Sequence, residues 1–275
     1  SYPIHIWGPL FAGAEVREIP VGTGEDFFEN VKQAYRFSWP RPRVIVLSFP
    51  HNPTTTCVDL AFMQRMVDFA LENEVLLVHD NAYAELGFDG FRPPSILQAE
   101  GAKQCAVELY SMTKSFSMAG WRIGFAVGNE RLLAALARVK SYLDYGAFTP
   151  VQVAATAALN GPETCIQEMR ATYRRRRDVL VESFGKAGWK IPAPTASMFA
   201  WVQIPERFRP LGSLEFSKLL VEKADVAVAP GIGFGEHGDD YVRIALVENE
   251  QRIRQAARCI RRFFDTADER LHNVV

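Results

Sequence analysis

The sequence has few cysteines, no cluster of metal-binding side chains and no long apolar run. Its four cysteines, Cys57, Cys105, Cys165 and Cys259, are widely spaced and form no CxxC pair. This pattern is typical of free thiols in a reducing compartment, and it excludes a disulfide framework and a cysteine zinc site. The five histidines are equally dispersed. We therefore expect no metal site, and we expect a cytoplasmic protein.

An excess of charge of either sign is also missing. The 31 basic side chains balance 32 acidic ones, which leaves a net charge of −1, so no basic field attracts nucleic acid or an anionic membrane. No apolar run reaches the roughly 18 residues that a membrane-spanning helix needs, and no signal peptide opens the chain. Hydrophobic residues make up 48% and charged residues 23%, an ordinary globular balance. Of the broad classes of protein, the composition leaves a soluble α/β-type enzyme, which we expect to have no nucleic-acid or membrane partner.

Short apolar runs alternate with helical stretches in the first part of the chain. The run 44–49 is rich in Val and Ile, which predicts a strand buried on both faces of a parallel sheet. The runs 75–78, 106–110 and 123–127 predict three more strands. Asp59 is expected to cap a helix whose apolar residues recur every three or four positions. This alternation indicates an α/β fold with a mostly parallel sheet.

The second part of the chain has a different pattern. A helix is predicted over 163–187, and shorter strands at 199–203, 227–229 and 241–246 then alternate with helices. We predict a large domain at 1–162 and a smaller α+β domain at 163–275 that includes the long linking helix. The basic run 174–177 is expected on the solvated face of that helix.

Four polar side chains follow the predicted strands of the large domain. Asn52, Asp80, Ser111 and Lys114 each stand one to four residues past the end of a predicted strand. In an open parallel sheet, ligands bind beyond the carboxyl ends of the strands. A lysine amine there can form a Schiff base with a carbonyl cofactor, of which pyridoxal 5′-phosphate is the common one.

That cofactor needs an anion at its ring nitrogen, donors at its phenolate oxygen, and hydroxyls and cations around its phosphate. Asp80 supplies the anion, and Asn52 with Tyr83 supplies the donors. Ser111 and Arg122 supply the phosphate contacts. His79, beside Asp80, either tunes the cofactor or is structural.

Several segments together resemble the signature of class I/II aminotransferases, which are pyridoxal-phosphate enzymes of fold type I, the aspartate aminotransferase fold. The similarity runs the whole length of the chain, and the motifs follow the family's order. The segments are Asn52-Pro53-Thr54, Asp80-Asn81-Ala82-Tyr83, Ser111 to Arg122, and Val242 to Leu246.

The resemblance implies a role for each matching residue. Lys114 would hold the cofactor and move a proton during catalysis, with Asp80 and Tyr83 as the other catalytic residues. Tyr2 would stack on the cofactor ring. Arg243 would clamp the substrate α-carboxylate through a bidentate pair of hydrogen bonds, and Asn52 would also contact substrate.

Residues 230–235, Pro-Gly-Ile-Gly-Phe-Gly, resemble a nucleotide-binding loop. A predicted strand follows them, so we interpret them as a tight backbone turn leading to Arg243.

The resemblance also implies that the large domain is N-terminally incomplete, because family members carry an N-terminal arm and a phosphate-binding turn before the point at which this chain starts. Charge-assisted hydrogen bonds to the phosphate contribute roughly 1.5–3 kcal/mol each. We therefore predict that the 275 residues alone bind pyridoxal 5′-phosphate weakly or not at all and are inactive. A visible absorbance band on addition of the cofactor, bleached by borohydride, would contradict this prediction.

Within the family, the segments Ser1 to His5, Met118 to Phe125, Lys140 to Tyr142 and Pro230 to Gly235 are most similar to the bacterial alanine (glutamate–pyruvate) aminotransferase group. The implied reaction is ping-pong transfer of an amino group between alanine and 2-oxoglutarate by a homodimer. LL-diaminopimelate aminotransferase and a pyridoxal-phosphate-dependent carbon–sulfur lyase are alternatives. The non-enzymatic alternatives are an inactive fragment of such an enzyme and the effector-binding part of a pyridoxal-type regulator.

Overall fold

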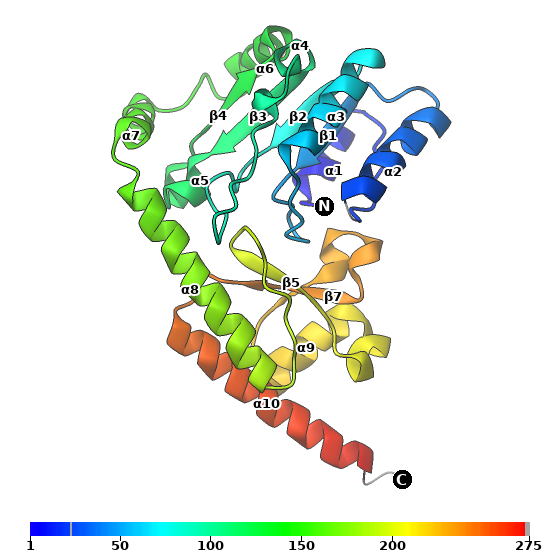
Figure 1. Ribbon diagram of the computed structural model, residues 1–275, viewed down its shortest axis with the longest axis vertical. Helices are drawn as coiled ribbons and strands as arrows, with labels where there is room; N and C mark the ends of the chain where they lie inside the picture. Colours follow the sequence, from blue (N-terminus) through cyan, green and yellow to red (C-terminus); the bar gives the residue numbers. More distant parts are fainter. Residues whose placement is uncertain (23, 273–275) are drawn as a thin grey trace. The chain divides into compact units, whose positions relative to one another are not determined.

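The computed structural model describes residues 1–22 and 24–272, and these divide into two compact units (Figure 1). The sheet unit comprises His5–Asn52 and Thr56–Arg170. The C-terminal unit comprises Ser1–Ile4, Pro53–Thr55 and the chain from Ala171 onward. Each unit is described separately below. In the described part of the chain, no helix combines the length and the apolar character needed to cross a membrane.

The sheet unit is built on four strands in the order β1-β2-β3-β4. They are β1 (Val44–Ser48), β2 (Leu76–Asp80), β3 (Ala106–Ser111) and β4 (Gly124–Gly128). The first three run parallel, and β4 is antiparallel to β3. The predicted strands and the mostly parallel sheet are confirmed. Because β1, β2 and β3 share one direction, their carboxyl ends meet at one edge of the sheet.

The helices of this unit are α1 (Ile4–Phe11), α2 (Gly24–Phe37), α3 (Leu60–Glu72), α4 (Ala102–Cys105), α5 (Met112–Ser115), α6 (Glu130–Leu143) and α7 (Thr149–Asn160), with short 3₁₀ turns η1 (Ile96–Gln98) and η2 (Ala119–Trp121). Asp59 caps α3, as the sequence predicts: its carboxylate accepts a hydrogen bond of 2.8 Å from the Phe62 amide. The cap satisfies an amide that has no partner within the helix.

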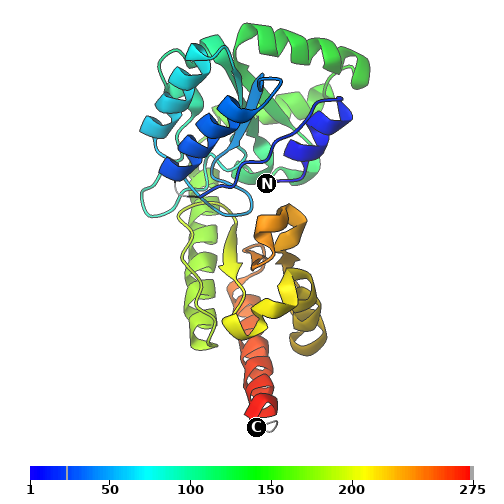
Figure 2. The same cartoon turned by 90° about the vertical axis from the view of Figure 1, so that its right-hand side faces the viewer.

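Two of these helices cover one face of the sheet. In both views α2 and α3 lie side by side over the strands (Figures 1 and 2). Phe27 of α2 and Met66 of α3 pack with Leu47 and Leu77 of the sheet in one buried apolar cluster. Burial of large apolar side chains contributes roughly 1.5–3 kcal/mol each. This core holds the carboxyl ends of the strands in place.

The strand β1 departs from the prediction of burial on both faces. Ile45 and Leu47 face the α2–α3 cluster, whereas Val44 is 47% exposed and Val46 is 36% exposed. Successive side chains of a strand point to opposite faces. In the described chain β1 stands at one edge of the sheet, and its second face lacks the cover that α2 and α3 give the first.

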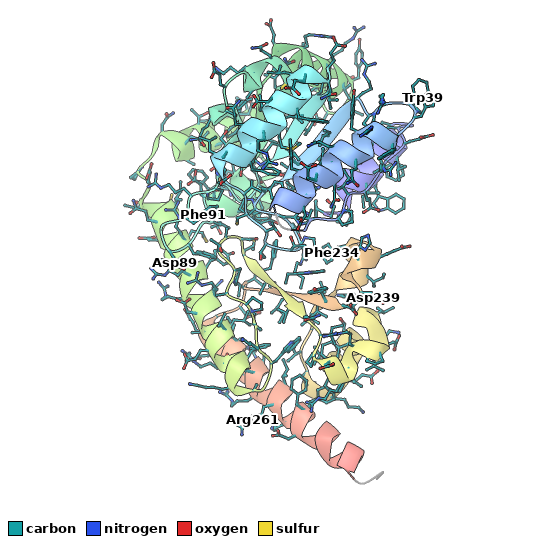
Figure 3. The ribbon with its side chains drawn as sticks, turned by 45° about the vertical axis from the view of Figure 1, so that its right-hand side comes forward. Trp39, Asp89, Phe91, Phe234, Asp239 and Arg261 are labelled. Carbon is teal, nitrogen blue, oxygen red and sulfur yellow. The ribbon has the colours of Figure 1, made fainter. Side chains whose placement is uncertain are left out.

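The C-terminal unit has a three-stranded antiparallel sheet in the order β5-β7-β6, formed by β5 (Phe199–Gln203), β6 (Ala229–Pro230) and β7 (Tyr241–Ala245). Its helices are α8 (Thr164–Lys186), α9 (Gly212–Ala224) and α10 (Glu250–His272), with 3₁₀ turns η3 (Glu206–Leu211), η4 (Gly231–Phe234) and η5 (Glu236–Gly238). An aromatic core joins Trp189, Phe208, Phe216 and Phe264. Asp239, labelled in Figure 3, accepts hydrogen bonds from the Ser213 amide and hydroxyl at 2.9 and 2.8 Å.

The division between the units falls inside α8, after Arg170, whereas the sequence places a boundary after residue 162. The contacts of the helix explain the position. Arg170 donates to the Glu85 carbonyl at 2.9 Å within the sheet unit. Two turns later, Arg176 donates to the Leu246 carbonyl at 3.1 Å within the C-terminal unit.

The basic run 174–177 is not wholly on the solvated face of α8, so that prediction is wrong for part of it. Arg177 is only 6% exposed. Its guanidinium donates to Asp178 at 2.6 Å and to the Pro194 carbonyl at 3.3 Å. These acceptors offset the cost of burying the charge.

All four cysteines are free thiols, as the sequence predicts.

Candidate active site

The carboxyl edge of the sheet carries the polar residues predicted for chemistry. Asp80 is the last residue of β2 and Ser111 is the last residue of β3. Lys114 follows directly in α5, and Asn52 stands four residues after the end of β1. The register places Asp80 opposite Ser48 of β1 and Leu109 of β3. One edge of one sheet therefore holds an amide, a carboxylate, a hydroxyl and an amine.

Asp80 has a partner that the sequence analysis missed. His5 of α1 donates from Nε2 to the Asp80 carboxylate at 2.8 Å. The aspartate side chain is 23% exposed, so the carboxylate remains open on one side. No local motif links two residues 75 positions apart. The only signal in the sequence was that His5 ends the segment Ser1 to His5, which resembles the alanine aminotransferase group.

Asn52 and Tyr83 form a buried pair of polar side chains. They are 5% and 7% exposed, and the Asn52 amide donates a long hydrogen bond of 3.4 Å to the Tyr83 hydroxyl. Next to Asn52, burial is the main cause that lowers the pKa of His51 from 6.5 to about 3. His51 is therefore a neutral ring at physiological pH. Asn52 and Tyr83 therefore lie side by side, and their contact with a cofactor stays a prediction.

Ser111 and Lys114 belong to the turn that follows β3. The Ser111 hydroxyl caps α5 by accepting a hydrogen bond of 3.2 Å from the Thr113 amide. A hydroxyl that accepts a bond still has its own hydrogen to donate, so Ser111 can serve an anion as well. Lys114 is half-buried and lies one turn further along. The turn holds both side chains close to the end of β3.

Arg122 ends the neighbouring turn in a left-handed backbone conformation, with φ of 50°. Its side chain is exposed and donates to the Ala119 carbonyl at 3.1 Å. Only a few per cent of residues other than glycine adopt positive φ, and such residues cluster at functional sites. Arg122 therefore lies in the connection from β3 to β4, two residues before β4 begins. Binding of a phosphate by Arg122 stays a prediction.

Arg243 and Tyr2 belong to the C-terminal unit. The Arg243 guanidinium lies 5.1 Å from the ring centre of Phe199 and 4.6 Å from that of Phe234, which is labelled in Figure 3. Two aromatic faces favour the cation and orient its planar fork. Tyr2 is 46% exposed. The roles predicted for Arg243 and Tyr2 stay predictions.

The glycine-rich segment 230–235 forms β6 and the 3₁₀ turn η4, and the prediction of a tight backbone turn is confirmed. A Cβ added at Gly231 would lie 2.0 Å from the Gly238 carbonyl oxygen and 2.4 Å from that of Tyr241. Only glycine permits this close approach of backbone to backbone. The turn precedes β7, which carries Arg243.

The donor set at the sheet edge fits pyridoxal 5′-phosphate. Asp80 offers a half-open carboxylate for a pyridinium nitrogen, Asn52 and Tyr83 offer donors for a phenolate oxygen, and Lys114 offers an amine for a carbonyl carbon. Among the residues that the structure describes, no group of three or more His, Cys, Asp or Glu side chains could hold a metal ion.

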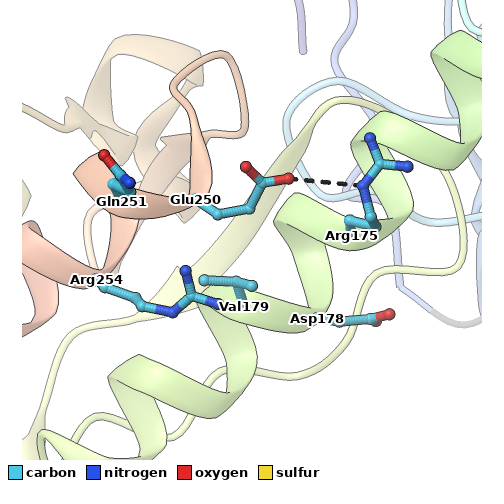
Figure 4. A pocket seen from close by; sticks show the side chains of 6 residues that line it. All are labelled: Arg175, Asp178, Val179, Glu250, Gln251 and Arg254. Atoms are coloured by element: carbon cyan, nitrogen blue, oxygen red, sulfur yellow. Dashed lines mark ion pairs between the residues drawn. The ribbon is translucent and has the colours of Figure 1, made fainter.

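A shallow hollow on the C-terminal unit is lined by residues of α8 and α10. Arg175 of α8 and Glu250 of α10 form an ion pair of 3.6 Å across it (Figure 4). Both side chains are substantially exposed, and exposed pairs of this kind contribute little to stability. The hollow contains none of the residues predicted for chemistry.

Known proteins resemble this chain over nearly all its length. AatC of Rhizobium meliloti (strain 1021) is 62% identical over 100% of this chain and 68% of its own length. Glutamate-pyruvate aminotransferase AlaC of Escherichia coli (strain K12) is 53% identical over 96% of this chain and 64% of its own. An LL-diaminopimelate aminotransferase of Moorella thermoacetica is 38% identical over 95% of this chain and 66% of its own. The chain therefore spans about two thirds of the length of these relatives.

A solved structure gives the same result for the fold. Substrate-bound BacF from Bacillus subtilis superimposes with a TM-score of 0.89 at 35% identity, over 96% of this chain and 66% of that one. The family model for aminotransferase class I and II matches residues 1–260. Members of this family and fold use pyridoxal 5′-phosphate. The chain belongs to the class I and II aminotransferases.

Proposed function

We propose that the protein transfers the amino group of alanine to 2-oxoglutarate, in ping-pong fashion, with pyridoxal 5′-phosphate held by Lys114. The observation that supports this most is the position of Lys114 and Asp80 at the ends of adjacent parallel strands of one sheet. The 53% identity to a glutamate-pyruvate aminotransferase supports the choice of substrates.

The cofactor, when bound, supplies a carbonyl that exchanges amines and a ring that accepts an electron pair. The Lys114 amine would bind it and would then move the proton at the substrate α-carbon. Asp80 would keep the ring nitrogen protonated by its negative charge. Asn52 and Tyr83 would donate to the phenolate oxygen from a buried position, where a hydrogen bond is stronger than in water. Ser111 and Arg122 would bind the phosphate.

The assay for this function uses the protein made from its complete reading frame. Alanine with 2-oxoglutarate should give pyruvate and glutamate, and omission of the keto acid should stop pyruvate formation after one turnover. Transfer from LL-diaminopimelate but not from alanine would favour the diaminopimelate alternative. Release of ammonia and pyruvate from cystathionine without a keto acid would favour a carbon–sulfur lyase, and no reaction with any of these would contradict the proposal.

Replacement of Arg243 by lysine should raise the KM for alanine by about 10–100-fold and change kcat much less. A lysine keeps the charge but loses the bidentate geometry, and hydrogen bonds to charged groups contribute about 1.5–3 kcal/mol. Initial rates at varied alanine concentration measure the effect. Arg252→Lys is the control, because Arg252 is exposed at the start of α10. An unchanged KM in R243K would remove Arg243 from the substrate site.

We further propose that the active protein is a homodimer. Apolar side chains of α6 and of the segment after it are strongly exposed, with Tyr142 at 79%, Tyr145 at 92% and Phe148 at 75%. Large apolar side chains that are exposed close together in the sequence favour an interaction surface. Light scattering that gives the mass of a strict monomer for the complete protein would contradict the dimer.

A further inference from the structure

A buried carboxylate lies next to the end of β2 and has no part in the proposed reaction. Glu108 of β3 is 5% exposed and accepts four hydrogen bonds. The donors are His79 Nδ1 at 3.0 Å, Asn81 Nδ2 at 3.2 Å, the Ser95 hydroxyl at 2.7 Å and the Ile96 amide at 2.9 Å. Two of the four donors, His79 and Asn81, are the residues on either side of Asp80.

The geometry of β2 determines which face of the sheet the Asp80 side chain points to. Successive side chains of a strand point to opposite faces, and His79 stands directly opposite Glu108 in the register of β2 and β3. His79, Asn81 and Glu108 therefore share one face of the sheet, and Asp80 points to the other. The Asn81 amide also donates to the Leu109 carbonyl at 3.0 Å. The backbone is thus held on both sides of Asp80.

His79 extends the same contact to the end of β1. Its ring is completely buried, and its Nε2 donates to the Phe49 carbonyl at 3.2 Å. Phe49 follows β1 and precedes Asn52 by three residues. One carboxylate is therefore linked, directly or through His79, to the chain segments that carry two of the residues assigned to the cofactor.

Glu108 holds these donors as an ion. Burial opposes its ionisation, but the hydrogen bonds and charge of His79 and the bonds from Ser95 and Asn81 outweigh it and lower the pKa of the carboxyl. A buried charge is tolerated only when it is paired and hydrogen-bonded. Loss of the carboxylate would leave several buried donors without an acceptor, and the segments that carry them would rearrange.

We propose that Glu108 is a positioning residue: by holding His79 and Asn81 on one face of the sheet, it fixes Asp80 on the opposite face, aimed at the ring nitrogen of a pyridinium cofactor. The role of the cofactor in this inference rests on the proposed function. The role of Glu108 in placing Asp80 does not depend on the proposed function. The hydrogen bond between His5 and the Asp80 carboxylate can be measured without any cofactor.

The test compares wild type with Glu108→Gln, which keeps the shape of the side chain and removes its charge. In long-range ¹H–¹⁵N spectra of the histidine rings, the His5 Nε2 signal of wild type should be that of a hydrogen-bonded nitrogen. In E108Q it should move toward the value of a solvated imidazole, although His5 lies on α1 and Glu108 lies on β3. The dissociation constant for pyridoxal 5′-phosphate, titrated with the protein from the complete reading frame, should rise about tenfold or more.

Asn129→Ala is the matched control for buried polar residues of the same unit. Asn129 is 8% exposed, caps α6 and donates to the Lys103 and Gln104 carbonyls at 3.0 and 2.8 Å. Its loss should lower the melting temperature but leave the His5 signal and the cofactor affinity unchanged. A folded E108Q protein that matches wild type in the His5 signal would overturn the inference.

If E108Q does not fold, Asn81→Ala decides. The Asn81 carbonyl oxygen is buried without a hydrogen-bond partner, so the alanine variant removes one unsatisfied atom together with one contact to Glu108. It should shift the His5 signal in the same direction by a smaller amount, and an unmoved signal would overturn the inference. If wild type shows no saturable binding of pyridoxal 5′-phosphate, the proposed function fails, while the His5 signal still decides the role of Glu108.

Discussion

Replacement of Lys114 by alanine should lower the rate of transamination by about 10⁴-fold, the upper end of what a positioned proton-transfer group contributes. The variant loses both the amine that binds the cofactor and the group that moves the proton at the substrate α-carbon. The turn that carries Lys114 should survive, because its cap comes from the Ser111 hydroxyl. Coupled measurement of pyruvate from alanine and 2-oxoglutarate gives the rate.

A second readout separates loss of chemistry from loss of folding. Borohydride reduction followed by peptide mass spectrometry should attach the cofactor to the peptide that contains Lys114 in wild type and to no peptide in K114A. Lys218→Ala is the control: Lys218 is exposed and pairs with Glu215 at 2.6 Å on α9. Exposed pairs contribute about 0–1 kcal/mol, so this variant should keep its activity. Retention of a tenth of the wild-type rate by K114A would exclude Lys114 as the cofactor lysine.

Replacement of Asp80 by asparagine should lower kcat by about 10²–10³-fold, as is typical when one preorganised electrostatic group is removed from an active site. The amide has the same shape but no charge, so it cannot keep the ring nitrogen of the cofactor protonated. The fold should be retained, because the amide oxygen of an asparagine can still accept the hydrogen bond from His5. Steady-state kinetics measures kcat, and circular dichroism checks the fold.

The control for D80N is Asp68→Asn in the same unit. Asp68 is exposed on α3 and accepts a hydrogen bond of 2.9 Å from Gln64, a bond that the amide oxygen of an asparagine can still accept. Its kcat should equal that of wild type. Equal kcat values for D80N and wild type would show that no charge is needed at this position, and would contradict the assignment of Asp80 to the ring nitrogen.

Local patterns in the sequence were sufficient for most of the secondary structure. The apolar runs before Asp80 and Ser111 mark strands, and Asp59 marks a helix start, because each depends on a few neighbouring residues. Predicted strand ends were short by one or two residues: Asp80 and Ser111 belong to β2 and β3. Polar side chains end an apolar pattern, yet the backbone ladder continues through them, since ladder hydrogen bonds do not depend on the side chain.

The errors concern burial, which depends on what packs against an element. Val44 and Val46 look like core residues, and they are exposed because the helices cover the other face of β1. Arg177 looks like a surface residue within a basic run, and it is buried because a carbonyl and a carboxylate lie within its reach. Hydrophobic periodicity describes one element at a time and contains no information about its neighbours.

By itself the sequence determined the fold class and the family, and it proposed a set of candidate site residues that includes Lys114, Asp80 and Arg243, because the family's motifs are short segments. Only the tertiary structure decided which residues support them. His5 reaches Asp80 from 75 positions away, and Glu108 holds both neighbours of Asp80 from the adjacent strand. The physical reason is that a carboxylate is positioned by hydrogen bonds across space, and the pairing of strands brings those donors and acceptors together.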